Sequence, residues 1–158
     1  MKVQKIPYHR FAWIFGMLLV QCLSIEVCGQ ETIKWKALTD VTFTEKYDQA
    51  IDGYWLLPTF GHKTKAWDNK RVILEGFFIP IDLDENFHVL SRYPYSSCFF
   101  CGGAGPESIV ELQLDKEVAK RLVMDQRLRF EGTLVLNDSD LYHCSYILAK
   151  AKPIQKHK

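Results

Sequence analysis

Five short segments rich in β-branched and aromatic residues follow Arg71, and one helical pattern interrupts them. Such segments are typical of strands. The predicted strands cover residues 71–81, 87–93, 108–112, 127–136 and 142–151. A helix is predicted over residues 116–124, between the third and fourth strands, with Asp115 as its cap. Three strands, a helix and two strands is the order of the OB barrel, a small closed β-fold.

Glycines inside two of these strands favour a barrel over a flat sheet. Gly76 and Gly132 lie within the first and fourth predicted strands, and glycine permits the sharp coiling that closes a small barrel. The predicted fold is therefore mainly β, a small OB-like β-barrel with one short helix and an N-terminal extension. A β-sandwich with one decorating helix is the alternative.

The first 29 residues have the pattern of an export signal. Lys2, Lys5 and Arg10 precede an apolar run, and Val27 and Gly29 are small residues before an expected cleavage site. An uncleaved anchor is the alternative. Cleavage predicts a periplasmic or secreted protein with no membrane span after removal of the signal. We divide the chain into a signal peptide (1–29), an N-terminal extension that packs on the barrel (30–70) and the OB-like barrel domain (71–158).

The extension has no sustained hydrophobic period. Its clearest segment is an apolar stretch between Gly53 and Gly61, which is expected to form a buried strand or a packed loop. The whole chain has 20 basic and 19 acidic residues, without a clustered basic excess. This balance argues against a nucleic-acid partner.

The main chemical motif is the C-x-x-C-G-G sequence that begins at Cys98 and includes Cys101. Two thiols at this spacing can share a metal or form a disulfide, and Gly102 and Gly103 leave the main-chain amides free to turn toward the sulfurs. A redox dithiol is a third possibility, although the glycines and Pro106 that follow are a poor helix start. Haem attachment through C-x-x-C-H is excluded because residue 102 is glycine.

A metal site would need further ligands. Cys98 and Cys101 are predicted to bind Zn²⁺, with His143 or Cys144 as the third ligand. Side chains alternate along a strand, so only one of His143 and Cys144 is expected at the site, and His143 is preferred. His62 and His88 are expected to be surface or loop histidines.

Aromatic residues surround the motif. Phe99, Phe100, Tyr93 and Tyr95 could stack a ligand, but they are expected to pack the loop onto the barrel. No complete catalytic motif accompanies them.

From Arg71 onward the chain resembles a family of exported, uncharacterised bacterial proteins with a small OB-like barrel. The resemblance is carried by Gly76-Phe-Phe-Ile-Pro80, Pro94-Tyr95, Cys98, Pro106 and Ile109-Val110. Relatives have a Cys-x-His start at the loop, whereas Phe100 occupies the histidine position here, so the chain resembles a separate C-x-x-C branch. The resemblance implies a fold and an envelope location.

Together these patterns predict an exported, non-catalytic binding or accessory protein of the cell envelope. Its C-x-x-C loop would bind a metal or form a disulfide, and its partner would be an envelope protein of a transport or assembly complex. The alternative is a periplasmic thiol-disulfide oxidoreductase that uses Cys98 and Cys101.

Overall fold

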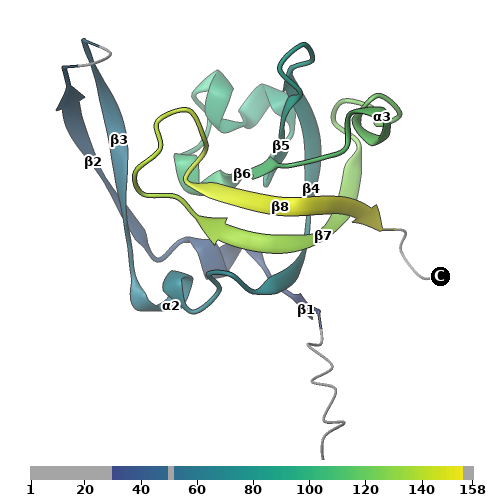
Figure 1. The fold of residues 1–158 in the computed structure, drawn as a ribbon, viewed down its shortest axis with the longest axis horizontal. Helices are drawn as coiled ribbons and strands as arrows, with labels where there is room; N and C mark the ends of the chain where they lie inside the picture. Colours follow the sequence, from purple (N-terminus) through teal and green to yellow (C-terminus); the bar gives the residue numbers. More distant parts are fainter. Residues whose placement is uncertain (1–29, 50–51, 155–158) are drawn as a thin grey trace, which may run out of the picture.

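Five strands close into a barrel in the computed structural model, which describes residues 30–49 and 52–154 (Figure 1). The strands are β4 (Arg71–Asp82), β5 (Phe87–Ser91), β6 (Ile109–Leu112), β7 (Arg127–Leu136) and β8 (Tyr146–Ile154). They are hydrogen-bonded in the order β4-β5-β6-β8-β7, and β7 returns to pair with β4. β6 and β8 pair in parallel, while the other barrel neighbours are antiparallel. The predicted OB-like barrel is confirmed.

Alternate side chains of the barrel strands fill its interior. Val72, Leu74 and Phe78 of β4 belong to the main core, together with residues of the other strands such as Phe130 and Leu148. The two strand glycines are needed because neighbouring atoms occupy the space of a side chain. A Cβ at Gly76 would lie 2.5 Å from the main-chain oxygen of Ser91, and one at Gly132 would lie 2.7 Å from Cγ of Leu148.

The helix between β6 and β7 is shorter than predicted. α3 covers Lys116–Ala119, and Oδ1 of Asp115 caps it by accepting from the main-chain N–H groups of Glu117 (3.0 Å) and Val118 (3.2 Å). The helix does not reach residue 124 because the chain turns back to the barrel. Asp125 has a positive φ of 60° and donates its N–H to the carbonyl of Phe78 (2.9 Å).

The N-terminal part of the extension is built into the barrel core. β1 (Glu31–Thr32) pairs in parallel with β4, and the 3₁₀ turn η2 (Trp35–Leu38) follows it. Ile33 and Leu38 are buried in the main core. The Trp35 indole N–H donates to the carbonyl of Glu75 (2.8 Å), and the Tyr146 hydroxyl donates to that of Leu38 (2.6 Å). A short helix, α2 (His62–Lys65), follows later in the extension.

The rest of the extension is a hairpin that projects from the barrel (Figure 1). Its strands are β2 (Val41–Asp48) and β3 (Gly53–Phe60), which form a separate two-stranded antiparallel sheet. β3 is the segment expected to be a buried strand or packed loop. Burial was predicted wrongly, since only Pro58 and Phe60, near the base of the hairpin, are buried.

The last strand starts later than the pattern predicts. β8 begins at Tyr146 rather than at residue 142, and residues 137–145 form a loop. The Asn137 side-chain N–H groups hold this loop by donating to the carbonyls of Asp140 (2.8 Å), His143 (3.3 Å) and Cys144 (3.3 Å). The strand alternation used to place His143 and Cys144 on opposite faces therefore does not apply to them. No helix within the described part of the chain is long and apolar enough to cross a membrane.

Candidate functional site

A second, smaller core lies on the outside of the barrel. Ile79 of β4, Val89 of β5 and Ile109 of β6 are buried there together with Cys98. These strand residues alternate with those that face the main core, so their side chains point outward. The partly buried side chains packed against this cluster are Ile81, Phe87, Phe99 and Cys144. The C-x-x-C loop thus covers one outer face of the barrel.

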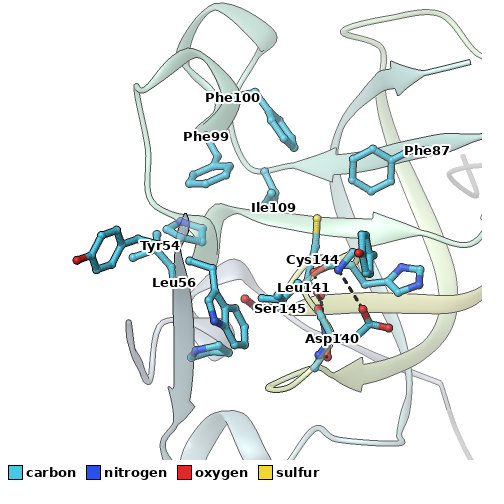
Figure 2. Close-up of a pocket in the computed structure, with 16 residues that line it drawn as sticks. Tyr54, Leu56, Phe87, Phe99, Phe100, Ile109, Asp140, Leu141, Cys144 and Ser145 are labelled. Carbon is cyan, nitrogen blue, oxygen red and sulfur yellow. Dashed lines mark hydrogen bonds between the residues drawn. The ribbon is translucent and has the colours of Figure 1, made fainter. Parts of the chain in front are cut away.

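Beside this outer core is a pocket of about 430 Å³ with three walls. The first wall is β3 of the hairpin, and the second is the C-x-x-C loop together with Phe87 of β5 and Ile109 of β6. The third wall is the loop before β8. Figure 2 shows Phe87, Phe99, Phe100 and Ile109 on the barrel side of this space and Tyr54 on the hairpin side. The lining residues are Tyr54, Trp55, Leu56, Pro58, Phe87, Phe99, Phe100, Pro106, Ile109, Asn137, Asp140, Leu141, Tyr142, His143, Cys144 and Ser145.

The pocket is rich in aromatic side chains, and several of them are exposed to solvent. Tyr142 is 85% exposed, Tyr54 72% and Phe100 43%. Large exposed apolar side chains that come together from separate segments are a usual mark of a binding surface. Asp140 is the only acid among the described residues that line the pocket, and none of them is Lys or Arg.

One polar group in the hairpin wall lacks a partner. The indole N–H of Trp55 is buried and makes no hydrogen bond within the described part of the chain. A buried donor left without an acceptor costs about 1–3 kcal/mol. This wall of the pocket therefore contains a buried hydrogen-bond donor that a bound ligand could pair.

A buried carboxylate anchors the loop before β8. Glu111 of β6 is only 5% exposed. One of its oxygens accepts from Nδ1 of His143 (2.8 Å) and the other from the main-chain N–H of Cys144 (3.0 Å). The prediction overlooked Glu111. The available signal was a single acid inside the apolar strand segment Ile109–Leu112.

The two cysteines of the motif lie in very different environments. Cys98 is fully buried in the outer core, whereas Cys101 is exposed, and Cys144 is intermediate. All three are free thiols. The expectation that the loop amides turn toward the sulfurs is wrong. The N–H groups of Cys101 and Gly103 donate to the carbonyl of Cys98 (3.2 Å each), and that of Gly102 donates to the carbonyl of Phe99 (3.0 Å).

Neither Cys101 nor Cys144 is activated as a nucleophile. Desolvation, followed by the neighbouring Cys98 thiol, raises the pKa of Cys101, and a hydrogen bond with Tyr95 only partly opposes this. Burial, with a smaller contribution from the Glu111 charge, raises the pKa of Cys144 to about 12. A reactive thiol needs a lowered pKa, because the thiolate is the nucleophile.

The remaining predicted ligands are distributed as follows. His143 is held by Glu111, and Cys144 packs against the cluster that contains Cys98. In residues 30–49 and 52–154, no group of three or more His, Cys, Asp or Glu side chains is arranged to hold a metal ion. The zinc site formed by Cys98, Cys101 and His143 or Cys144 stays a prediction.

The two other histidines differ from each other. His62 is exposed in α2, as expected for a surface histidine. His88 was predicted wrongly as a surface or loop residue. It is 2% exposed and faces the barrel interior, where its ring lies 5.5 Å from that of Phe78. The alternation that carries Leu90 inward places His88 on the same side of β5.

Comparison with protein-family models, curated proteins and solved structures finds no significant match for this chain. The resemblance to exported bacterial OB-like proteins stays a prediction.

The pocket lies on the face of the barrel that OB folds use to bind ligands. β5 and β6 are the second and third barrel strands, and OB barrels bind their ligands on the face of those two strands. Here the face is enclosed by the C-x-x-C loop, which joins the second and third strands, and by the loop that joins the fourth and fifth.

Proposed function

We propose that this protein is an exported, non-catalytic binding or accessory module of the cell envelope, and that its ligand occupies the aromatic pocket. The observation that carries the proposal is the pocket of about 430 Å³ on the ligand-binding face of an OB-like barrel. Its size lies within the range of about 300–1,000 Å³ that is usual for ligand sites. Export rests on the charged and apolar pattern of residues 1–29, which lie outside the described residues.

The surroundings of the pocket favour binding over catalysis. The nearby thiols of Cys101 and Cys144 have raised pKa values, so neither is prepared for nucleophilic attack. His143 is tied through Nδ1 to a carboxylate that also holds the main chain of the same loop. This arrangement serves to fix the third wall of the pocket.

A fragment screen by saturation-transfer NMR tests the proposal. Small aromatic molecules are expected to bind the wild-type protein and to lose binding in Phe100→Ser and Tyr142→Ser, because both side chains line the pocket. Tyr93→Ser is the matched control, since Tyr93 is also an exposed tyrosine and is not among the lining residues. Equal binding to all four proteins would overturn the proposal.

The alternative function, thiol-disulfide exchange, is favoured by one observation. The Cys98 and Cys101 side chains lie close enough to form a hydrogen bond with each other. A reduction potential between about −270 and −120 mV with rapid exchange would support an enzyme, whereas one below about −300 mV would indicate a structural disulfide.

Metal analysis tests whether Cys98 and Cys101 bind zinc or form a structural disulfide. Protein purified from its native compartment is compared with the Cys98→Ser/Cys101→Ser double variant. Stoichiometric zinc in the wild type alone would support the predicted site. Absence of both zinc and free thiols at these residues would indicate a disulfide.

A further inference from the structure

The pocket is bordered by a strand edge that has no partner. Within the described parts of the chain, β3 pairs with β2 and with no other strand. Residues Tyr54, Trp55 and Leu56 all line the pocket, although neighbouring side chains of a strand point to opposite faces. The pocket must therefore lie along the edge of β3 rather than over one of its faces. Figure 1 shows β3 on the barrel side of the hairpin, with β2 outside it.

The alternation of hydrogen-bonded and non-hydrogen-bonded pairs between β2 and β3 shows which main-chain groups of β3 point to its free edge. Gly61 donates its N–H to the carbonyl of Asp40 (2.7 Å), in line with the β2–β3 register. In an antiparallel pair, hydrogen-bonded and non-hydrogen-bonded positions alternate. Counting from Gly61, the residues of β3 that do not bond to β2 include Tyr54, Leu56 and Pro58. Their main-chain groups point away from β2 and toward the pocket.

Two independent features agree with this assignment. Pro58 has no N–H to donate, and proline in a strand is restricted to positions that need no ladder donor. Tyr54 is opposite Tyr47, and their rings lie in contact with centroids 5.3 Å apart. Side chains approach most closely at non-hydrogen-bonded pairs.

We propose that the edge of β3 binds an extended peptide segment of a partner protein, which adds a third strand to the hairpin sheet. This inference rests on the proposed binding function and names the class of ligand. The N–H and carbonyl groups of Tyr54 and Leu56 would pair with the peptide main chain. Alternate peptide side chains would then enter the pocket, as in other cases of strand addition.

The pocket also defines the side chains that the peptide should carry. Phe99, Phe100 and Tyr142 form an apolar and aromatic surface for large side chains. Asp140 is the only acidic residue among the described residues that line the pocket, and aromatic faces attract cations. The partner segment is thus expected to alternate large apolar residues with others and to include a Lys or Arg. The bound chain would also bring main-chain acceptors to the wall that contains the unpaired Trp55 indole.

The experiment starts from a displayed library of random ten-residue peptides, selected on the purified protein. One selected peptide is synthesised with a fluorophore, and its dissociation constant is measured by anisotropy. The enriched sequences are expected to show large apolar residues at alternate positions with at least one Lys or Arg. Enrichment of acidic or helix-patterned sequences would overturn the proposal.

Variants separate main-chain from side-chain binding. Leu56→Pro removes an outward N–H from β3, and Leu56→Ala shortens the side chain but keeps that N–H. The peptide is expected to bind about tenfold more weakly to Leu56→Pro than to Leu56→Ala, the effect of losing one buried hydrogen bond. Glu45→Pro is the matched control because Glu45 is opposite Leu56 and its N–H points to the other edge of the hairpin. It should bind within about twofold of wild type.

A measurement on the wild-type protein tests the proposal without depending on whether the variants fold correctly. Hydrogen exchange followed by NMR should show that the Tyr54 and Leu56 amides become protected when the peptide binds. Unchanged exchange at both amides would overturn strand addition, whatever the variants show. Self-association in the absence of peptide that Leu56→Pro abolishes would also overturn it, since a second copy would then be the occupant.

The outcomes distinguish this inference from the proposed function. If no peptide is selected but aromatic fragments bind in a way that depends on Phe100 and Tyr142, strand addition is wrong and the binding function stands. If neither peptides nor fragments bind, both proposals fail.

Discussion

Nδ1 of His143 donates a 2.8 Å hydrogen bond to the carboxylate of Glu111, across 32 positions of the sequence. The second oxygen of Glu111 accepts from the main chain of Cys144, so one buried side chain holds two consecutive residues of the loop before β8. This loop forms the third wall of the pocket. The shape of the pocket therefore depends on a residue that does not line it.

Glu111→Gln should destabilise the protein by about 1–3 kcal/mol. The amide replaces a charged acceptor by a neutral one, and its single oxygen can accept from only one of the two N–H groups. Its NH₂ group can pair with Nδ1 of His143 only after the ring moves its proton from Nδ1 to Nε2. The free energy of unfolding in urea measures the effect. Glu117→Gln is the control, because Glu117 forms an exposed ion pair with Lys120 and such pairs contribute about 0–1 kcal/mol. Equal losses in the two variants would contradict the role given to Glu111.

His88 should make the barrel sensitive to acid. Burial lowers the pKa of His88 below its ordinary value of 6.5, and Nδ1 has no partner within the described residues. The unfolded chain gains a proton on this side chain as the pH falls through about 6.5, whereas the folded protein resists protonation. Stability is therefore highest above that pH and decreases as the pH falls toward the lowered pKa.

The urea midpoint at about pH 7.5 and pH 5 tests this effect. His88→Gln should show a smaller decrease between the two values than wild type does. Glutamine can still donate to Oδ1 of Asn86, which the Nε2 of His88 contacts at 3.1 Å. His62→Gln, at an exposed histidine, should leave the decrease unchanged. A decrease of the same size in His88→Gln would contradict the prediction.

Of the three thiols in the described part of the chain, only that of the exposed Cys101 should react in the folded protein. In reduced, folded protein at about pH 8, iodoacetamide should modify the exposed Cys101 first. Cys98 is fully buried and Cys144 has a pKa of about 12, so both should react only after unfolding. Peptide mass spectrometry of timed samples gives the three rates. Modification of Cys144 as fast as that of Cys101 would show that the outer core opens readily.

Gly76→Ala should destabilise the barrel by about 1–3 kcal/mol through crowding. The added Cβ would lie 2.5 Å from the main-chain oxygen of Ser91, so β4 or β5 must move. Gly102→Ala gives a contrast, because nothing lies within 4 Å of its Cβ and only its φ of +74° is unfavourable. That change should cost about 1 kcal/mol. Thermal unfolding that shows Gly102→Ala to be the more damaging change would contradict this account.

The barrel could be predicted from the sequence because its signals are local. Alternation and β-branched composition located the strands, and Gly76 and Gly132 marked the positions where the strands pack too closely for a side chain. The position of His88 was also present in the alternation of β5, since Leu90 shares its face. It was missed because histidine is usually found at the surface.

The pocket could not be predicted because it depends on long-range contacts. Three segments form it, and the fixed position of the last one comes from Glu111 and from the side chain of Asn137. These bonds replace the strand expected at residues 142–145 by a loop. As a result His143 and Cys144 both bond to the side chain of Glu111, whereas strand alternation predicted that they point to opposite faces.

The hairpin has its own sheet, separate from that of the barrel. The main-chain groups of β3 that are proposed to bind a partner thus lie in a different hydrogen-bonded unit from the strands that close the barrel. In the proposed binding mode, substitutions at Tyr54 and Leu56 change what β3 binds, while the main barrel core, to which Phe60 of β3 belongs, stays as it is. A family of proteins with this architecture could diversify its partners by varying one hairpin, at little cost to folding.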